Sequence, residues 1–276
     1  MPSAIPSFLT ARMKTSVKMN GVFVPFSKSL DNVQRFCRPL AAHNAGNDYD
    51  VSLYGSGFLF RVAGRNLMVC SRHQVVNSGR DPGDLMIILG EGDNAVGMTP
   101  SAVGHVSVVG SELEAVGDIF LAEFASGPGG RDISGSFFKV DFDVDADLRT
   151  IQPQDVTLIF TVGYPSRLVG YEPTYDEGYD LRDLAIYSRW AKVYLELDDL
   201  VRSDIPGLVP LQVHQSYRIE LGDPDGFSGA PVFFIYQDAQ RVSHLGFAGM
   251  VTHASELGRF SMVEASYIHQ AIRAML

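Results

Sequence analysis

The stretch GFLFRVAGRNLMVC, residues 57–70, holds two short apolar runs on either side of an Ala-Gly-Arg break. Runs rich in Val, Ile, Leu and Phe that are bounded by Gly, Asp, Asn or Ser are typical of β-strands. From about Tyr49 onward the same texture recurs, in runs over residues 85–89, 103–109, 119–124, 156–162, 191–197, 217–221, 232–236 and 245–252. Few helical periods lie between these runs. The sequence therefore predicts an all-β fold of the sandwich or barrel kind rather than an alternating α/β fold.

Two short helices are expected near the ends of the chain. Ser29 can cap a helix whose apolar positions, from Leu30 to Cys37, are spaced like one helical face. Between Tyr267 and Met275 the apolar positions again have helical spacing, which predicts a short C-terminal helix.

A change of composition near residues 141–153 indicates a connection between two lobes. Acidic and apolar residues alternate in DFDVDAD, residues 141–147, and Pro153 follows. The aspartates match the start of a calcium-binding loop, but Ala146 and Gln152 stand where that motif requires glycine and glutamate. We therefore interpret the segment as a solvated connection.

This connection divides the 276 residues into three expected parts. They are an N-terminal extension with a short helix over 1–48, an N-terminal β-barrel over 49–140 and a C-terminal β-barrel with the final helix over 141–276. A second acidic stretch, YDEGYDLRD at residues 175–183, is expected to be a long loop.

Charge and composition limit the partners. The formal net charge is −10 and no cluster of Lys and Arg is visible along the sequence, which disfavours nucleic acid and anionic lipid. No apolar run reaches the length of a membrane span or a signal peptide. Of the two cysteines, Cys37 and Cys70, the second lies in an apolar run and is expected to be a buried free thiol. These features favour a cytoplasmic protein.

The segment GDPDGFSGAP, residues 222–231, has the composition of a nucleophile turn. A serine hydroxyl needs a base to take its proton and backbone N–H groups aimed at the developing oxyanion. Glycines on both sides of Ser228 let the chain turn sharply and leave such N–H groups free. We expect Ser228 to be the nucleophile, with the N–H groups of Gly226 and Ser228 as the oxyanion donors.

A histidine and a carboxylate complete the expected catalytic site. Among seven histidines, His73 is the best placed general base because it directly follows an apolar strand. Asp118 opens a strongly apolar strand, where a buried carboxylate is unfavourable unless it is paired. Pairing with His73 would remove that penalty and fix the tautomer of the histidine.

These segments together resemble the trypsin/chymotrypsin-like serine peptidases, in particular their bacterial and intracellular branch. The segments CSRH at 70–73, GDIFL at 117–121 and GFSGAP at 226–231 are similar to the family's histidine, aspartate and nucleophile motifs, in the same order. VGYP at 162–165 resembles a segment common in that branch. The resemblance covers roughly residues 50–276. It implies two packed six-stranded antiparallel β-barrels and a serine endopeptidase that acts on a protein or peptide substrate without metal or cofactor.

The resemblance also implies a substrate pocket. In the family this pocket is built from residues just before the nucleophile and from a later strand. The corresponding residues here are Gly222, Asp223 and Asp225 before the nucleophile, and Thr252, His253 and Ala254 on the strand. Gly222 at the pocket floor argues against a simple preference for Lys or Arg, whereas Asp223 and Asp225 favour a basic side chain. Phe227 stands where secreted members have the aspartate that pairs with a new N-terminus. Something else must hold the oxyanion turn, and an activating protein partner is one alternative.

Two other functions stay open. A peptidase-like fold that is latent or inactive and serves as a binding module is compatible with the sequence. An esterase of the α/β-hydrolase kind nearly fits GFSGA at 226–230, but it requires a helix directly after the serine. Pro231 and the β-rich run at 232–236 oppose such a helix.

Overall fold

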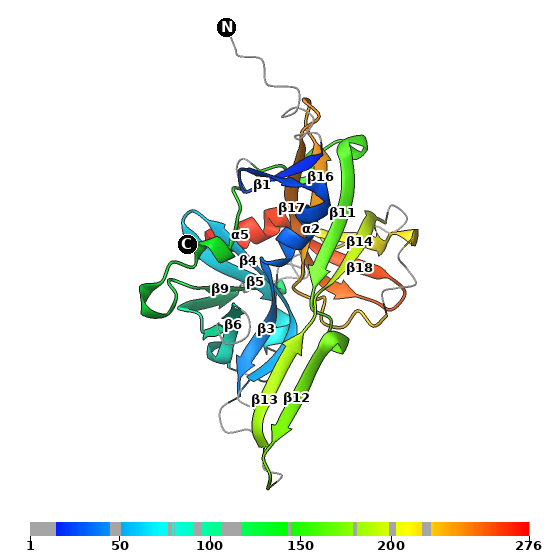
Figure 1. Cartoon of the computed structure of the whole chain (residues 1–276). Helices are drawn as coiled ribbons and strands as arrows, with labels where there is room; N and C mark the ends of the chain where they lie inside the picture. The colour runs from blue at the N-terminus through cyan, green and yellow to red at the C-terminus, as the bar shows by residue number, and fades with distance from the viewer. Residues whose placement is uncertain are drawn as a thin grey trace.

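The computed structural model of the chain describes residues 15–44, 51–76, 79, 81–90, 95–105, 117–142, 145–178, 181–198, 203–216 and 222–275. The protein is mostly β, with 51% of residues in strands and 20% in helices, which confirms the all-β prediction. Two β-lobes lie side by side, and α5, Ala265–Met275, crosses between them (Figure 1). The strand expected over 217–221 and the end of the one over 103–109 lie outside the described residues.

The C-terminal lobe is a closed barrel of six antiparallel strands. The strands are ordered β16-β11-β14-β15-β18-β17, and pairing between β16 and β17 closes the ring. Their bounds are β11 Val156–Gly163, β14 Ala191–Leu197, β15 Leu208–Val213, β16 Pro231–Gln237, β17 Ser243–Ala254 and β18 Arg259–Glu264. Buried side chains such as Leu211, Phe234 and Val251 fill its interior.

The N-terminal lobe is a curled sheet that forms half a barrel. Its strands are ordered β7-β6-β3-β4-β5-β9-β8, and β10 pairs in parallel with β4. Their bounds are β3 Cys37–His43, β4 Val51–Val62, β5 Arg65–Ser71, β6 Leu85–Leu89, β7 Val96–Met98, β8 Ala102–His105, β9 Ile119–Glu123 and β10 Phe138–Lys139. Within the described part of the chain no pairing joins β7 to β8. The expected closed barrel is therefore confirmed for the C-terminal lobe alone.

The first described segments do not form a separate extension, so the boundary expected near residue 48 is wrong. β3 belongs to the N-terminal sheet because it pairs with both β4 and β6 and buries Leu40, Ala41 and Ala42. β1, Ser16–Met19, and β2, Val22–Pro25, instead extend the sheet of the C-terminal barrel, where β1 pairs in parallel with β17. The residues expected to form the extension are thus divided between the two lobes.

Both predicted terminal helices are present. α2 covers Phe26–Gln34 and begins before Ser29, whose hydroxyl donates to the Phe26 carbonyl at 2.8 Å instead of capping the helix. α5 buries Ile268 and Ile272, as its predicted apolar spacing requires. α3, Arg72–Val76, is a single turn after β5. Short 3₁₀ turns are η1 Pro82–Asp84, η4 Pro128–Gly130, η5 Ser134–Ser136, η6 Leu148–Thr150, η7 Pro153–Asp155 and η8 Ser166–Leu168.

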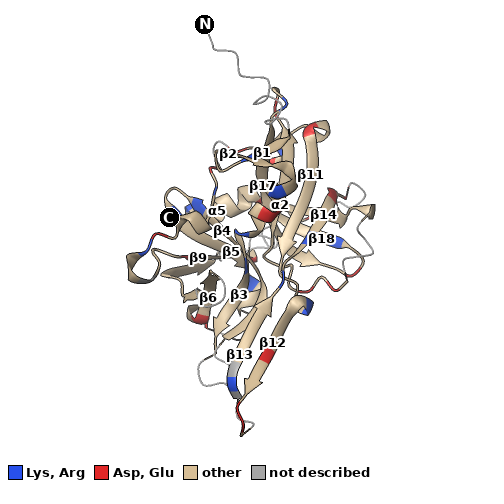
Figure 2. Cartoon of the chain, in the orientation of Figure 1, with Lys and Arg blue, Asp and Glu red and all other residues tan. Residues whose placement is uncertain are grey.

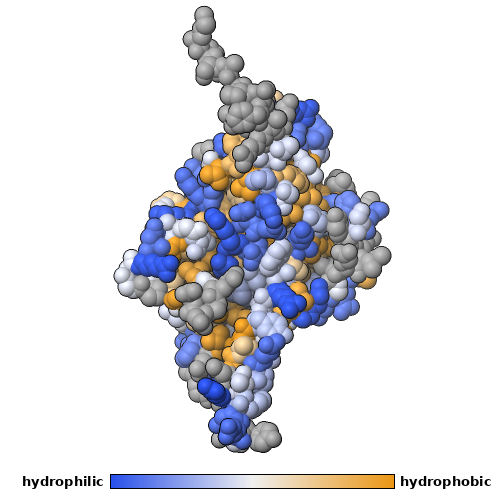
Figure 3. Space-filling model, viewed as in Figure 1, coloured by the Kyte–Doolittle hydropathy of each residue, from blue (hydrophilic) through white to orange (hydrophobic). Residues whose placement is uncertain are grey.

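The long loop expected over residues 175–183 is shorter in the structure, because a two-stranded hairpin includes both ends of that stretch; residues 179–180 lie outside the described residues. β12, Val169–Tyr175, and β13, Leu181–Ser188, pair along their whole length and extend away from both lobes (Figure 1). Side chains from Tyr171 to Tyr175 are all exposed, so the segment lacks the buried alternation by which strands are predicted. The free end of the hairpin is hydrophilic in the face seen in Figure 3.

An aromatic cluster joins the two lobes. Phe58 of β4 packs against Phe233 of β16 and Phe247 of β17, with ring centroids 5.3 and 4.8 Å apart. Phe138 of β10 contacts Phe58 and Phe233 in the same cluster. Because large aromatic rings dominate burial in a core, the seam between the lobes is continuous hydrophobic core.

The remaining sequence predictions concern cysteines, metals and membranes. Cys37 and Cys70 are both free and buried, as expected for Cys70. Among the residues described, no group of three or more His, Cys, Asp or Glu is arranged to hold a metal ion. Nor does that part of the chain contain a helix long and apolar enough to cross a membrane. Charged residues of both signs are scattered over the ribbon in Figure 2.

Candidate active site

Two neighbouring strand ends bring His73 and Asp118 together. β5 ends at Ser71 and is followed by α3, which carries His73. Asp118 lies directly before β9, and Ser71 pairs with Ile119 in the antiparallel ladder. The Arg72 N–H donates to the Asp118 carbonyl at 2.6 Å, and the His73 N–H donates to Asp118 Oδ1 at 2.9 Å. The backbone thus fixes the carboxylate beside the histidine.

The imidazole of His73 faces this carboxylate. Its Nδ1 lies 2.9 Å from Oδ1 and 3.0 Å from Oδ2 of Asp118. The two side chains are 35% and 17% exposed, so solvent partly reaches the pair. The hydrogen bond to Asp118 raises the pKa of His73 above its ordinary value, and burial opposes this with a smaller effect. With Nδ1 donating to the carboxylate, Nε2 is left to accept a proton.

Replacing Asp118 with asparagine should lower the pKa of His73 toward its ordinary value of about 6.5, because the largest cause of the upward shift is removed. An NMR titration of the His73 imidazole measures this change. Asp238→Asn is the matched control, since Asp238 pairs with His244 at 2.8 Å elsewhere in the barrel. An unchanged His73 titration in Asp118→Asn would contradict the assignment.

The same pair links stability to pH. Because the folded-state pKa of His73 lies above its unfolded value, the protonated pair stabilises the fold fully below about pH 6.5. That contribution is lost as the pH rises through the folded-state pKa. Asp118→Asn should therefore reduce the free energy of unfolding more at low pH than at high pH.

Ser228 lies in a tight turn directly before β16. The Phe227 N–H donates to the Pro224 carbonyl at 3.1 Å, and Gly226 has a φ of +92°, which glycine adopts without strain. Phe227 is fully buried and packs against Phe260 with ring centroids 5.8 Å apart. A strand follows the serine where an α/β-hydrolase requires a helix, so the structure contradicts that alternative.

The turn leaves two backbone donors unused. The N–H groups of Phe227, Gly229 and Ala230 donate to backbone carbonyls at 2.8 to 3.1 Å. Those of Gly226 and Ser228 have no partner within the described part of the chain. Unpaired donors at alternate positions of one turn can converge on a single acceptor.

The direction of the Gly226 N–H is set from the other side of its peptide bond. The Ser166 N–H donates to the Asp225 carbonyl at 2.8 Å. Because this peptide is trans, its carbonyl and its N–H point in opposite directions. The N–H of Gly226 therefore points away from Ser166 and stays available to an acceptor.

Ser56 ties this turn to the N-terminal lobe, a role that was not predicted. Its buried hydroxyl donates to the Gly226 carbonyl at 2.6 Å and accepts the Tyr164 N–H at 2.8 Å. Its own N–H donates to the Ser228 carbonyl at 3.3 Å. A serine between Gly55 and Gly57 inside an apolar strand is the sequence signal that points to it.

Ser228 and His73 lie at one site but do not bond directly to each other among the residues described. The Ser228 hydroxyl donates to the Thr252 carbonyl at 2.9 Å. The next residue, His253, stacks its ring on that of His73, with centroids 5.8 Å apart and planes at 29°. Thr252 and His253, which are adjacent in β17, thus link Ser228 to His73.

A second contact joins the residues that follow them in sequence. Gln74 lies against Gly229, where an added Cβ would be 3.1 Å from Gln74 Oε1. The same amide also lies against Gly55. The two contacts together bring the ends of α3 and the serine turn to the same place at the seam of the lobes.

The six expected substrate residues fall into two groups. Gly222, Asp223 and Asp225 are exposed before the turn, and Thr252, His253 and Ala254 end β17. Arg167, which was not predicted, lies beside the first group. Its Nε donates to the Asp223 carbonyl at 3.2 Å and would lie 3.2 Å from a Cβ on Gly222. This cation opposes the basic side chain that the two aspartates favour.

Comparison with known proteins does not supply a family. No protein-family model matches the chain, and no curated protein matches it. The chemistry of the site therefore has to be argued from its own geometry.

Proposed function

We propose that this protein is a serine endopeptidase in which Ser228 is the nucleophile, His73 the general base and Asp118 the group that orients it. The observation that carries the proposal is the doubly contacted His73–Asp118 pair beside a serine turn with two unpaired N–H groups. A carboxylate on Nδ1 leaves Nε2 to take the serine proton, and unpaired donors suit an oxyanion. We further propose that the curled sheet and the closed barrel are the two lobes of a trypsin/chymotrypsin-like peptidase.

The reaction begins with a rotation of the Ser228 side chain. Its hydroxyl turns from the Thr252 carbonyl toward His73, a change about one χ1 bond between staggered rotamers. The hydrogen bond that is given up contributes only about 1 kcal/mol, and such rotations take picoseconds to nanoseconds at partly exposed positions. The hydrogen bond to Thr252 is therefore only a small obstacle to activation of the nucleophile.

Acyl transfer then follows in two halves. Ser228 Oγ attacks the scissile carbonyl as its proton passes to His73 Nε2, and the N–H groups of Gly226 and Ser228 stabilise the oxyanion. The tetrahedral intermediate collapses, the C–N bond breaks, and the proton on His73 passes to the leaving amine. Water attacks the acyl-enzyme by the same route, which releases the carboxylate product and restores Ser228.

The oxyanion turn has internal supports that replace the missing aspartate. Phe227 is anchored by burial against Phe260, and Ser56 and Ser166 bind the turn through hydrogen bonds. We infer that the turn forms without the activating partner that the sequence leaves open. The substrate is a cytoplasmic protein or peptide, and Arg167 beside Gly222 disfavours simple cleavage after Lys or Arg.

A latent, non-catalytic module is the second candidate. It is favoured by one observation, the Ser228 hydroxyl that is bonded to Thr252 rather than to His73. In that case the rotation described above would be blocked until a partner binds. The experiment that follows separates the two candidates.

A fluorophosphonate probe should label the purified protein at Ser228 without any added partner. The labelling should fall to background in Ser228→Ala and in His73→Ala, because the probe requires an activated hydroxyl. His244→Ala is the control, since that histidine pairs with Asp238 away from the site. A correctly folded protein that stays unlabelled would reject the peptidase and support the module. Mass spectrometry of the labelled peptide identifies the residue.

A further inference from the structure

A cavity of about 860 Å³ opens where the connection between the lobes meets α5. Its walls come from the end of β4, from η5 and β10, from residues 140–142 of the connection and from α5. None of the residues proposed for catalysis lines it. The cavity is therefore separate from the candidate active site.

The lining of this cavity is cationic in an acidic protein. It contains Arg35, Arg61, Lys139 and Arg273 but only one carboxylate, that of Asp141. In the whole chain, by contrast, 32 acidic residues outnumber 22 basic ones. The four cations are far apart in sequence, so the absence of a Lys/Arg cluster along the chain did not reveal them. Folding gathers these residues around one cavity.

Three of these cations are not engaged in direct ion pairs in the described part of the chain. The Arg35 guanidinium lies over the Phe36 ring at 4.7 Å. Arg61 and Lys139 act on the nearby carboxylates of Asp132 and Asp145 only through space. Their charge is therefore largely available to a ligand.

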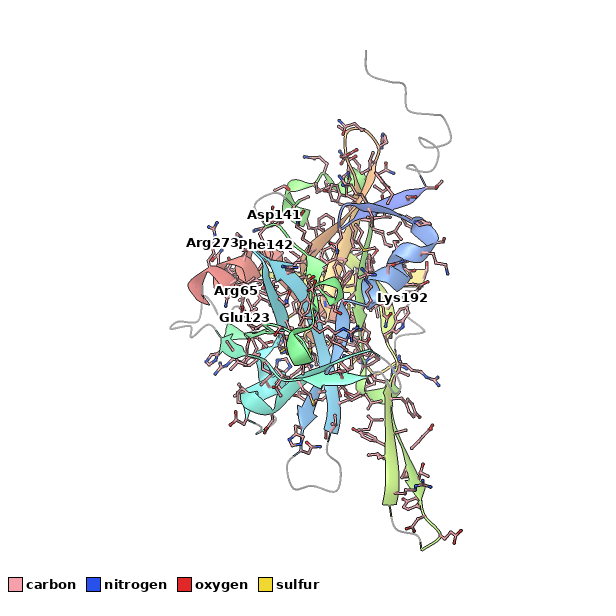
Figure 4. The ribbon with its side chains drawn as sticks, turned by 60° about the vertical axis from the view of Figure 1, so that its left-hand side comes forward. Arg65, Glu123, Asp141, Phe142, Lys192 and Arg273 are labelled. Atoms are coloured by element: carbon pink, nitrogen blue, oxygen red, sulfur yellow. The ribbon has the colours of Figure 1, made fainter. Side chains whose placement is uncertain are left out.

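An apolar floor accompanies the cations. Phe142 and His269 line the cavity and stack on each other, with ring centroids 4.6 Å apart and planes at 10°. Ile272 and Val140 also line the cavity but are almost fully buried, so the apolar surface open to a ligand comes mainly from the two rings. Figure 4 shows Asp141, Phe142 and Arg273 together on one side of the molecule. A ligand that fits this lining has an anionic end and an apolar or aromatic body.

We propose that this cavity binds a small phosphorylated organic molecule of nucleotide size. Its volume lies within the range of about 300–1,000 Å³ that is usual for small-molecule sites. Arginine binds phosphate oxygens in bidentate fashion, and several cations around one cavity match a ligand with more than one negative charge. The body of the ligand lies on the floor formed by Phe142 and His269.

Isothermal titration calorimetry with ATP in the presence of EDTA tests the proposal on the full chain. We expect a Kd below about 1 mM at low salt, with weaker binding as sodium chloride is raised. Arg61→Gln and Lys139→Gln should each weaken binding by about tenfold, because each removes a charge-assisted contact. Lys192→Gln is the matched control, since Lys192 lies on the opposite side of the molecule in Figure 4 and should leave binding unchanged.

Two further probes separate the parts of the proposed ligand. Adenosine lacks phosphate and should not bind measurably, and pyrophosphate lacks the aromatic body and should bind more weakly than ATP. No binding of ATP, or equal weakening by Lys139→Gln and Lys192→Gln, would overturn the site. Pyrophosphate that binds as tightly as ATP would overturn the assignment of the apolar floor. Melting temperatures of the ligand-free variants confirm that each one is folded.

Discussion

Ser228→Ala should reduce peptide hydrolysis by roughly 10⁴- to 10⁶-fold while leaving the melting temperature nearly unchanged. The loss is large because the acyl-enzyme cannot form without the hydroxyl, so only oriented water and the oxyanion donors remain. The fold is retained because the hydroxyl makes one hydrogen bond, to the Thr252 carbonyl, at a partly exposed position. Initial rates on a protein substrate such as casein, together with thermal unfolding, measure both quantities.

The matched control for this variant is Ser101→Ala, which removes an exposed hydroxyl that donates to the Glu123 carbonyl far from the turn. It should leave the rate unchanged. If Ser228→Ala hydrolysed the substrate at the original rate, the measured activity would belong to another group or to a contaminant. Equal losses in both variants would point to a general effect on folding rather than to catalysis.

Gly229→Ala should destabilise the protein by more than about 3 kcal/mol. Gly229 has a φ of +81°, and a Cβ there would lie 2.0 Å from the Ser56 carbonyl oxygen. That oxygen belongs to β4 of the other lobe, so the clash can be relieved only by separating the serine turn from the N-terminal sheet. Urea unfolding measures the loss of free energy, and the fluorophosphonate probe measures the loss of the site.

Gly21→Ala separates backbone strain from this clash. Gly21 has the same φ of +81°, but nothing lies within 4 Å of the position of its Cβ. Its cost should therefore be only that of a left-handed alanine, about 1–2 kcal/mol. Comparable losses for the two variants would mean that Ser56 moves aside easily and that the contact between the lobes is not tight.

The elements that the sequence predicts well are those whose buried side chains form a local pattern of apolar residues. The apolar run at 66–70 falls within β5, the run at 57–62 covers the second half of β4, and the helical spacing at the C-terminus matches α5. His73 and Asp118 could be selected because each flanks an apolar strand. The hydrogen bond between them, 2.9 Å from Nδ1 to Oδ1, depends on the pairing of β5 with β9. The local sequence pattern does not specify which strands pair.

The features that escaped prediction depend on contacts between distant segments. The side chains of β12 from Tyr171 to Tyr175 lie in solvent, so no burial pattern marks that strand of the hairpin. Ser56 binds the Gly226 carbonyl, which lies 170 residues away in sequence. A single serine in the sequence does not indicate which distant residue its hydroxyl will contact. Lys139 and Arg273 meet around one cavity only because the connection between the lobes passes beside α5.

The pairing of β1 with β17 also restricts the order in which the chain can fold. Val17 of β1 pairs with Ser243 of β17, and most of both lobes lies between them in sequence. During synthesis on the ribosome β1 can pair at once with β2, but its other edge must wait until β17 has emerged. Because contacts between such distant segments are slow to form, docking of the N-terminal strand should be a late step in folding. A chaperone that shields the open edge of β1 would then protect the nascent chain until β17 is made.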